Sequence, residues 1–315
     1  MSFNRVFLVS IATMATALAA EGQLPVRPQT EDASRPTFTS RSELVVLHVM
    51  VKDGRGGYVS GLDKNAFQIS EEGRPQEISF FTSQDEPVSV GLLLDASGSM
   101  QASRELVLAS GVAFVKTSNP LDEVFVLGFN EYVHNPLPPE APFTRDLITL
   151  RLAMLRATPA RGKSAVYDAI DAGLDYVARG AYERRVLVLV SDGGDNASET
   201  TEDEILARTQ ASNVLMYAVG LIDPAGNDAD PGFLKRITRS TGGEAFFPSD
   251  SKKVTNALEG IARDIRNTYT IGFVADRAQS KSLLRRVQVR ARSSTGRQLN
   301  VRTRSAYLTG VGEQG

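Results

Sequence analysis

A nearly uninterrupted apolar run at positions 88–94 ends abruptly at Asp95. A strand with one face in water alternates apolar and polar residues, whereas a strand buried on both faces does not. The run therefore predicts a strand that helices cover on both sides, which is typical of a parallel sheet.

The segments that follow alternate between strand and helix patterns. Strand-like runs are expected at 123–129, 132–137, 185–190, 214–219 and 245–247. Helical spacing of apolar residues is expected at 103–116, 144–157, 165–178, 202–212, 230–240 and 252–266, with Thr144 or Asp146 near the cap of the second helix. Such alternation predicts an α/β fold with a doubly wound, mostly parallel sheet.

β character flanks this region on both sides, at 43–52, 58–69 and 75–81, and again at 269–274, 285–291 and 300–306. The simplest arrangement pairs the two flanks into one small β domain built from both chain ends. The arginines at 285–292 alternate with Val287 and Val289, and we expect them on the solvated face of a strand pair. The expected divisions are a signal peptide (1–20), a disordered lead-in (21–41), an N-terminal β segment (42–84), the α/β domain (85–267), a C-terminal β segment (268–308) and a tail (309–315).

The N-terminus has the pattern of a signal peptide. Arg5 precedes a short apolar run at 6–18, and Ala17-Leu18-Ala19 resembles a cleavage site. The run is shorter than the roughly 20 residues that cross a bilayer, and no later segment is long and apolar enough to do so. We therefore expect an exported protein, periplasmic or secreted after cleavage, with no transmembrane segment in the mature chain.

Composition excludes several function classes. The chain has no cysteine, which removes disulfides, thiolate nucleophiles and a lipid-anchored N-terminal cysteine. His48 and His134 are the only histidines, and we expect each at the surface or at a strand edge rather than as a metal ligand. A net charge of −2 gives no overall basic excess that would indicate nucleic-acid binding.

Oxygen-bearing side chains follow two of the buried strands. Asp95, Ser97 and Ser99 form an Asp-x-Ser-x-Ser loop after the first, and Asp192 follows another with glycine beside it. Ser164 stands between them at the start of a predicted helix. Because ligands bind at the carboxyl ends of strands in open α/β sheets, these residues predict a site for a hard cation such as Mg²⁺, Mn²⁺ or Ca²⁺.

Other interpretations of these residues remain open. Ser97 and Ser99 suit the cap of the next helix, Asp192 suits the cap of its own turn, and Asp195 is a possible extra ligand. The stretch 157–164 approaches the phosphate-loop pattern, but it starts with Ala157 and follows a predicted helix where that motif requires a strand. We therefore expect no nucleotide binding.

The three segments resemble the metal-ion-dependent adhesion site (MIDAS) of von Willebrand factor A (VWFA) domains. In that family the first loop is Asp-x-Ser-x-Ser, the second supplies a threonine and the third an Asp-Gly pair. By position, the resemblance implies that Ser97 and Ser99 bind the metal directly, while Asp95 and Asp192 act largely through water. Ser164 replaces the usual threonine, which keeps the hydroxyl but loses the methyl that restricts its rotamer.

The resemblance extends over about residues 42–308, through phrases such as Tyr58-Val-Ser-Gly-Leu-Asp63 and Thr241-Gly-Gly-Glu244. It is closest to a bacterial "VWFA-related" group, in which short β segments flank a Rossmann-like A domain. In this family a Glu or Asp of a partner protein completes the coordination of the metal.

The resemblance implies that the protein recognises an acidic side chain of a partner protein or peptide through one bound divalent cation. We expect this cation to be Mg²⁺, with Mn²⁺ or Ca²⁺ as alternatives. The alternative is a metal-independent structural or assembly protein of the periplasm or cell surface that contacts partners through its β segments. We expect no enzyme, because no histidine or spare glutamate lies next to these loops in the sequence and no G-x-S-x-G motif is present.

Overall fold

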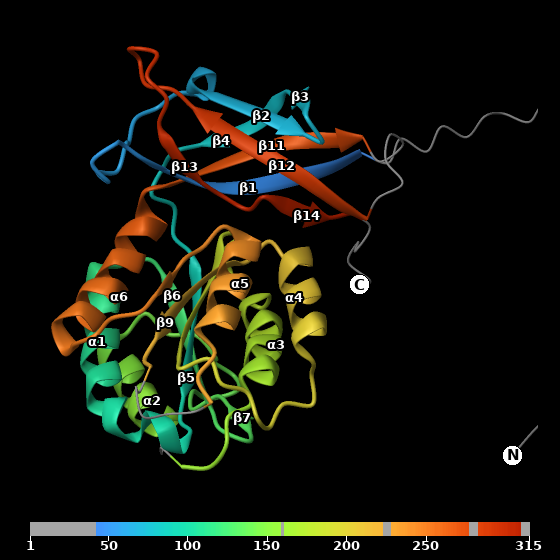
Figure 1. Cartoon of the computed structure of the whole chain (residues 1–315). Coiled ribbons are helices and arrows are strands. Elements are labelled where there is room, and N and C mark those ends of the chain that lie inside the picture. Colours follow the sequence, from blue (N-terminus) through green and yellow to red (C-terminus); the bar gives the residue numbers. More distant parts are fainter. Residues whose placement is uncertain (1–41, 159–160, 223–227, 277–282, 310–315) are drawn as a thin grey trace, which may run out of the picture. The chain divides into compact units, whose positions relative to one another are not determined.

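The computed structural model describes residues 42–158, 161–222, 228–276 and 283–309 (Figure 1). The predicted signal peptide and lead-in, and residues 310–315 of the predicted tail, lie outside the described residues.

A six-stranded sheet forms the centre of the α/β unit, in the order β10-β9-β8-β5-β6-β7. Neighbouring strands are parallel except β6 and β7, which are antiparallel. The predicted fold class is therefore confirmed, although the edge strand expected at 132–137 is much shorter than its pattern indicated. The strands are β5 (Ser89–Asp95), β6 (Glu123–Phe129), β7 (Val133–His134), β8 (Arg185–Ser191), β9 (Leu215–Gly220) and β10 (Ala245–Phe246).

Helices cover both faces of this sheet (Figure 1). On one face α1 (Arg104–Thr117) packs between α2 (Leu147–Ala157) and α6 (Ser251–Arg266). On the other lie α3 (Val166–Val177), α4 (Glu202–Ala211) and α5 (Pro231–Thr241). Every residue of β5 is buried as a result, which is what its apolar run predicted.

The two flanks of the chain pair into a β unit of two four-stranded sheets. One has the order β13-β1-β11-β4 and the other β14-β12-β2-β3. β1 runs antiparallel to β11 from Ser42 opposite Asp276 to Met50 opposite Thr268, so strands from opposite ends of the sequence lie side by side. The strands are β1 (Ser42–Lys52), β2 (Phe67–Glu71), β3 (Arg74–Gln76), β4 (Ile78–Thr82), β11 (Thr268–Asp276), β12 (Leu284–Ala291), β13 (Asn300–Arg302) and β14 (Ala306–Leu308).

Three expected strands differ from those observed. The expected strand at 58–69 starts only at Phe67, because Asp63 caps a short 3-10 helix, η1 (Lys64–Ala66). The expected strand at 75–81 divides into β3 and β4, and that at 300–306 into β13 and β14, which pair with different sheets. Apolar periodicity does not reveal where a strand crosses between sheets.

The two sheets share one core, and this corrects the expectation for the arginines of β12. Burial alternates along β12, so that Val287 and Val289 point inward and Arg286 and Arg290 outward. Arg285 has the same phase as the valines and is buried, donating to Glu71 Oε1 at 3.0 Å. A strand has a period of two, and adjacent arginines must therefore point to opposite faces.

Contacts between the α/β unit and the β unit bury several charged groups. Arg302 of β13 pairs with Glu244 and with Asp264 of α6, and Tyr58 also donates to Asp264. Lys52 Nζ lies 3.3 Å from the same carboxylate. Asp264 is buried, so these partners offset the cost of removing its charge from water.

His48 lies in these contacts and is buried on β1, which is an inner strand of its sheet, so the expectation of a surface or strand-edge position was wrong. Burial, together with the charges of Arg184 and Arg304, lowers the pKa of His48 to about 3. The imidazole is therefore neutral in the folded protein at neutral pH. His134 is exposed on β7, as expected of a residue at the sheet edge.

We predict that His48 destabilises the protein as the pH falls. The unfolded state binds a proton near pH 6.5, while the folded state does not do so until about pH 3. Stability should therefore decline below pH 6.5, by about 2 kcal/mol between pH 7 and pH 5 from this one group. Urea unfolding at both pH values should show that loss in the wild type but not in His48→Gln, and equal losses in the two proteins would contradict the assignment. Any contribution from Asp122, whose pKa burial raises to about 6, is common to both proteins and cancels.

Candidate metal centre

Three loops meet at the carboxyl ends of β5 and β8. One leaves β5 at Asp95, the second leaves β8 at Ser191, and the third leads into α3 through Arg161–Ala165. Backbone hydrogen bonds join them: Arg161 N donates to Ala96 O at 2.8 Å, and Gly98 N donates to Gly162 O at 3.1 Å. The loops are thus held as one structural unit by main-chain bonds.

A small cavity of about 150 Å³ lies where these loops meet. Four of the five predicted ligands line it, and they come from all three loops: Ser97, Ser99, Ser164 and Asp192. Gly162, Lys163, Gly194, Asn196 and Asp228 complete the lining. Residues up to 131 positions apart in the sequence, from Ser97 to Asp228, therefore surround one space. Four of the residues predicted from the sequence are among them.

Asp95, the fifth predicted ligand, is buried and connects the three loops through its carboxylate. Its Oδ1 accepts from Ser97 N at 2.9 Å. Its Oδ2 accepts from Ser164 Oγ at 3.1 Å and from Ser191 Oγ at 2.6 Å. Burial raises the pKa of Asp95, and the nearby negative charge of Asp192 raises it further. The hydrogen bonds to the carboxylate lower the pKa and oppose part of this shift.

The hydroxyls of the first loop are not used as a helix cap. Ser97 occupies the N-cap position of the 3-10 helix η2 (Gly98–Ser103) but makes no side-chain capping bond. Its Oγ instead lies 3.1 Å from Ser99 Oγ. The structure therefore does not support the interpretation of Ser97 as a helix cap. Asp192 does cap its own turn, because its Oδ1 accepts from Gly194 N at 3.0 Å.

The donor set fits a hard cation. Three serine hydroxyls and the carboxylate of Asp192 line the cavity together with Asp228, and the buried carboxylate of Asp95 accepts from one of these hydroxyls. Among the described residues, neither Asp95 nor Asp192 takes part in an ion pair. Buried carboxylates without a basic partner are costly unless a cation balances them. Within the same part of the chain no cluster of three or more His, Cys, Asp or Glu side chains has metal-binding geometry, so any metal here depends on the serine hydroxyls.

Several contributors were not singled out in the sequence. Ser191 donates to Asp95, and Asn196 Oδ1 accepts from Ser164 N at 2.9 Å. Asp228 lines the cavity from a segment far along the chain. Ser191 directly precedes the predicted ligand Asp192, and Asn196 follows it by four residues. This nearness in the sequence is the only feature that could have pointed to them. Asp228 had none.

Asp195, considered as an extra ligand, does not line the cavity. Its Oδ2 accepts from Tyr167 N at 3.1 Å at the start of α3, and also from Ser198 Oγ at 2.5 Å. The carboxylate therefore caps a helix and closes a turn, which is a structural role.

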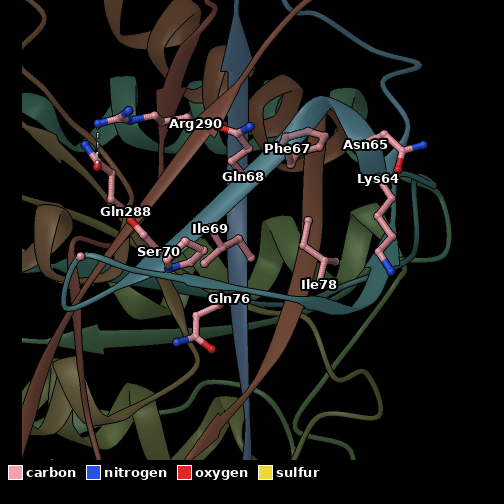
Figure 2. A pocket seen from close by; sticks show the side chains of 12 residues that line it. Lys64, Asn65, Phe67, Gln68, Ile69, Ser70, Gln76, Ile78, Gln288 and Arg290 are labelled. Atoms are coloured by element: carbon pink, nitrogen blue, oxygen red, sulfur yellow. Dashed lines mark hydrogen bonds between the residues drawn. The ribbon is translucent and has the colours of Figure 1, made fainter.

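A larger cavity, of about 690 Å³, lies on the β unit and is shown in Figure 2. Its lining comes from η1, β2, β3, β4 and β12, and includes Lys64 and Arg290. Two of its lining residues are hydrogen-bonded to each other, since Arg290 Nη2 donates to Gln288 Oε1 at 3.3 Å (Figure 2). No carboxylate and none of the predicted ligands line it, so its greater size does not make it the candidate metal centre.

Comparison with known proteins identifies the central region. The family model described as the von Willebrand factor type A domain matches residues 89–260. No curated protein matches the chain.

Among solved structures, proximal thread matrix protein 1 of the mussel byssus, described with a zinc-occupied MIDAS motif, is 15% identical with a TM-score of 0.50. That match covers 63% of this chain and 50% of the mussel chain. A von Willebrand factor type A protein from Catenulispora acidiphila is 11% identical, covering 85% and 73% of the two chains with a TM-score of 0.49. BatB from Bacteroides thetaiotaomicron is 18% identical, covering 56% and 97% with a TM-score of 0.46. At such low identity the likeness concerns the fold.

We predict that Gly162→Ala disturbs the loop that carries Ser164. Gly162 has φ +87°, and an added Cβ would lie 2.5 Å from Glu131 Oε2. The Glu131 carboxylate, which accepts from Lys163 N at 3.0 Å, would have to move. Thermal or urea unfolding should show a loss of about 2 kcal/mol, from backbone strain and the weakened hydrogen bond together.

Gly56→Ala is the matched control, because Gly56 has φ +84° and no atom within 4 Å of the added Cβ. It isolates the backbone strain, at about 1 kcal/mol. Equal losses in the two variants would show that the contact with Glu131 contributes nothing.

Proposed function

Because this chain belongs to the von Willebrand factor type A domain family, we propose that it is a metal-dependent binding module that recognises an acidic side chain of a partner protein or peptide. The proposed metal ligands are Asp95, Ser97, Ser99, Ser164 and Asp192. The observation that carries the proposal is the convergence of three loops, with hydroxyls and carboxylates, on one small cavity at the strand ends.

The serines and the two aspartates have different roles in the proposed site. Ser97, Ser99 and Ser164 present neutral hydroxyl oxygens at the cavity. Asp95 is fixed by bonds from Ser97, Ser164 and Ser191, so it orients the hydroxyl of Ser164 while its own charge stays buried. Asp192 lines the cavity directly and adds a second negative charge. This ligand set is hard and oxygen-only, which favours Mg²⁺, with Mn²⁺ or Ca²⁺ as alternatives.

A bound cation supplies positive charge that attracts an anionic oxygen. The serine hydroxyls that face the cavity are neutral and donate little charge to the ion, so the ion stays electrophilic and can take a carboxylate oxygen from outside as a further ligand. The mussel byssus protein described with zinc at its MIDAS motif has the same fold, and this supports a divalent ion at the corresponding place here.

We propose binding rather than catalysis. Metal-assisted hydrolysis needs a general base beside the site. Neither histidine lines the cavity, and the carboxylate of Asp195 is occupied by Tyr167 and Ser198. Asp228 lines the cavity outside the proposed ligand set, but no histidine accompanies it there.

The decisive measurement is calorimetric titration of Mg²⁺ and Mn²⁺ into the EDTA-treated protein. We expect saturable one-to-one binding that Asp95→Ala abolishes and Ser99→Ala weakens at least about tenfold, because each removes a ligand or its support. Asp195→Asn is the control and should bind within about twofold of the wild type, since its side chain does not line the cavity.

A second arm tests recognition of an acidic group. The metal-loaded protein should bind a peptide with one central glutamate more tightly than the same peptide with glutamine, and EDTA should remove the difference. Metal binding that Asp95→Ala leaves unchanged would refute the proposed site. Absence of any binding would favour the metal-independent assembly role instead.

We also propose that the protein is exported, on the strength of the N-terminal pattern at 1–20. Among the described residues, no helix has both the length and the apolar character needed to cross a membrane. The protein recovered from the periplasm or the medium should have an intact mass lower than the full chain by the mass of about its first 20 residues. Recovery of the full-length mass from the cytoplasm alone would rule this out.

A further inference from the structure

Helix α2 is apolar on two opposite faces. Leu150, Ala153, Met154 and Ala157 are buried against the α/β unit. On the other side Ile148, Leu152 and Leu155 are 71%, 48% and 40% exposed. These three lie at i, i+4 and i+7, and at about 100° per residue they form one continuous stripe along the outer side of the helix. We call them the α2 stripe.

A helix on the surface of a globular domain normally turns polar residues to water. A helix that is apolar on both sides is instead typical of one covered from both directions. The stripe is not a scatter of single exposed residues, because its three side chains are neighbours on adjacent turns. Such a patch marks a surface that another molecule covers.

The charges around the stripe indicate what that molecule carries. Arg151 and Arg156 lie on either side of it by helical position, and both are exposed. Arg104 of α1 reaches the same helix, where its Nη2 donates to Leu155 O at 3.3 Å. Neither Arg151 nor Arg156 forms an ion pair with any other described residue. The sequence of α2 contains no Asp or Glu.

We propose that the α2 stripe docks an amphipathic helix of a partner protein, with apolar residues at i, i+3 or i+4 and i+7 and with acidic residues on its flanks. Apolar side chains would pack against Ile148, Leu152 and Leu155, and flanking carboxylates would pair with Arg151 and Arg156. This surface is distinct from the metal centre and uses none of its residues.

Two other occupants fit the charges less well. A second copy of the chain would bring α2 against α2, where the arginines of both helices would meet only the N-cap carboxylate of Asp146, which already accepts from Thr149 N at 2.7 Å. An anionic membrane surface attracts proteins with a broad basic excess, whereas this chain has a net charge of −2. An acidic helix satisfies both the apolar stripe and its two arginines.

The test uses a fluorescent synthetic peptide about 18 residues long, a helix-forming sequence with leucines at the stated spacing and glutamates beside them, and a twin with lysines in place of the glutamates. Fluorescence anisotropy with the wild-type protein should show saturable binding of the acidic peptide but not of its twin. Leu152→Gln and the double variant Arg151→Glu/Arg156→Glu should each weaken it at least about tenfold. EDTA should have no effect, which separates this surface from the metal centre.

Leu44→Gln is the matched control, since Leu44 on β1 is 52% exposed, close to the value for Leu152. It should leave peptide binding unchanged. Leu44→Gln and Leu152→Gln should lower the unfolding temperature by a similar small amount, because both side chains are about half exposed. Acidic-peptide binding that is absent, or insensitive to both α2 variants, would overturn the proposal. So would Leu152-dependent binding to phosphatidylglycerol vesicles, or a Leu152-dependent dimer in sedimentation, where the peptide fails to bind.

Discussion

The burial of β5 on both faces is the constraint from which the rest of the α/β unit follows. Its neighbours pack so closely that Gly91 leaves no room for a side chain, since a Cβ there would lie 2.3 Å from the ring of Phe125. A strand in this position can carry polar side chains only where it ends. Asp95 is the residue at that end, and it is held by hydrogen bonds from three different loops. The position of the candidate metal centre is thus a consequence of how the sheet is covered.

The same reasoning explains why the site is assembled from distant segments. In a parallel sheet all strands end at one edge, so the loops after β5 and β8 meet without any long-range contact being specified in sequence. The loop before α3 joins them through its backbone bonds and through Ser164. Ser164 supplies a hydroxyl that donates to Asp95 at 3.1 Å. The role of the site as a metal-dependent binding surface remains our proposal.

The β unit shows how an α/β domain is inserted into a fold made by both chain ends. Pairing of β1 with β11 brings the chain back beside its own beginning. Three charged or titratable groups are buried near the contacts between the two units: Asp264, His48 and Arg304. Asp264 is compensated by Arg302, Lys52 and Tyr58, whereas His48 is kept neutral by its surroundings. The pH response expected from His48 therefore arises where the two units touch.

The sequence alone indicated the α/β class and the alternation of strands and helices in the middle of the chain, and it pointed to the five residues that we propose as metal ligands. It also indicated that the two flanks pair. Periodicity states which residues share a face, but it does not state what covers that face. For that reason Arg285 and His48 were expected in solvent and are buried, while Leu152 repeats at a helical spacing typical of a core and is exposed. The hydrogen bond from Ser191 to Asp95 and the position of Asp228 at the cavity likewise depend on how the chain packs. Only the tertiary structure decided these points, because burial depends on contacts between segments that have no fixed separation in the sequence.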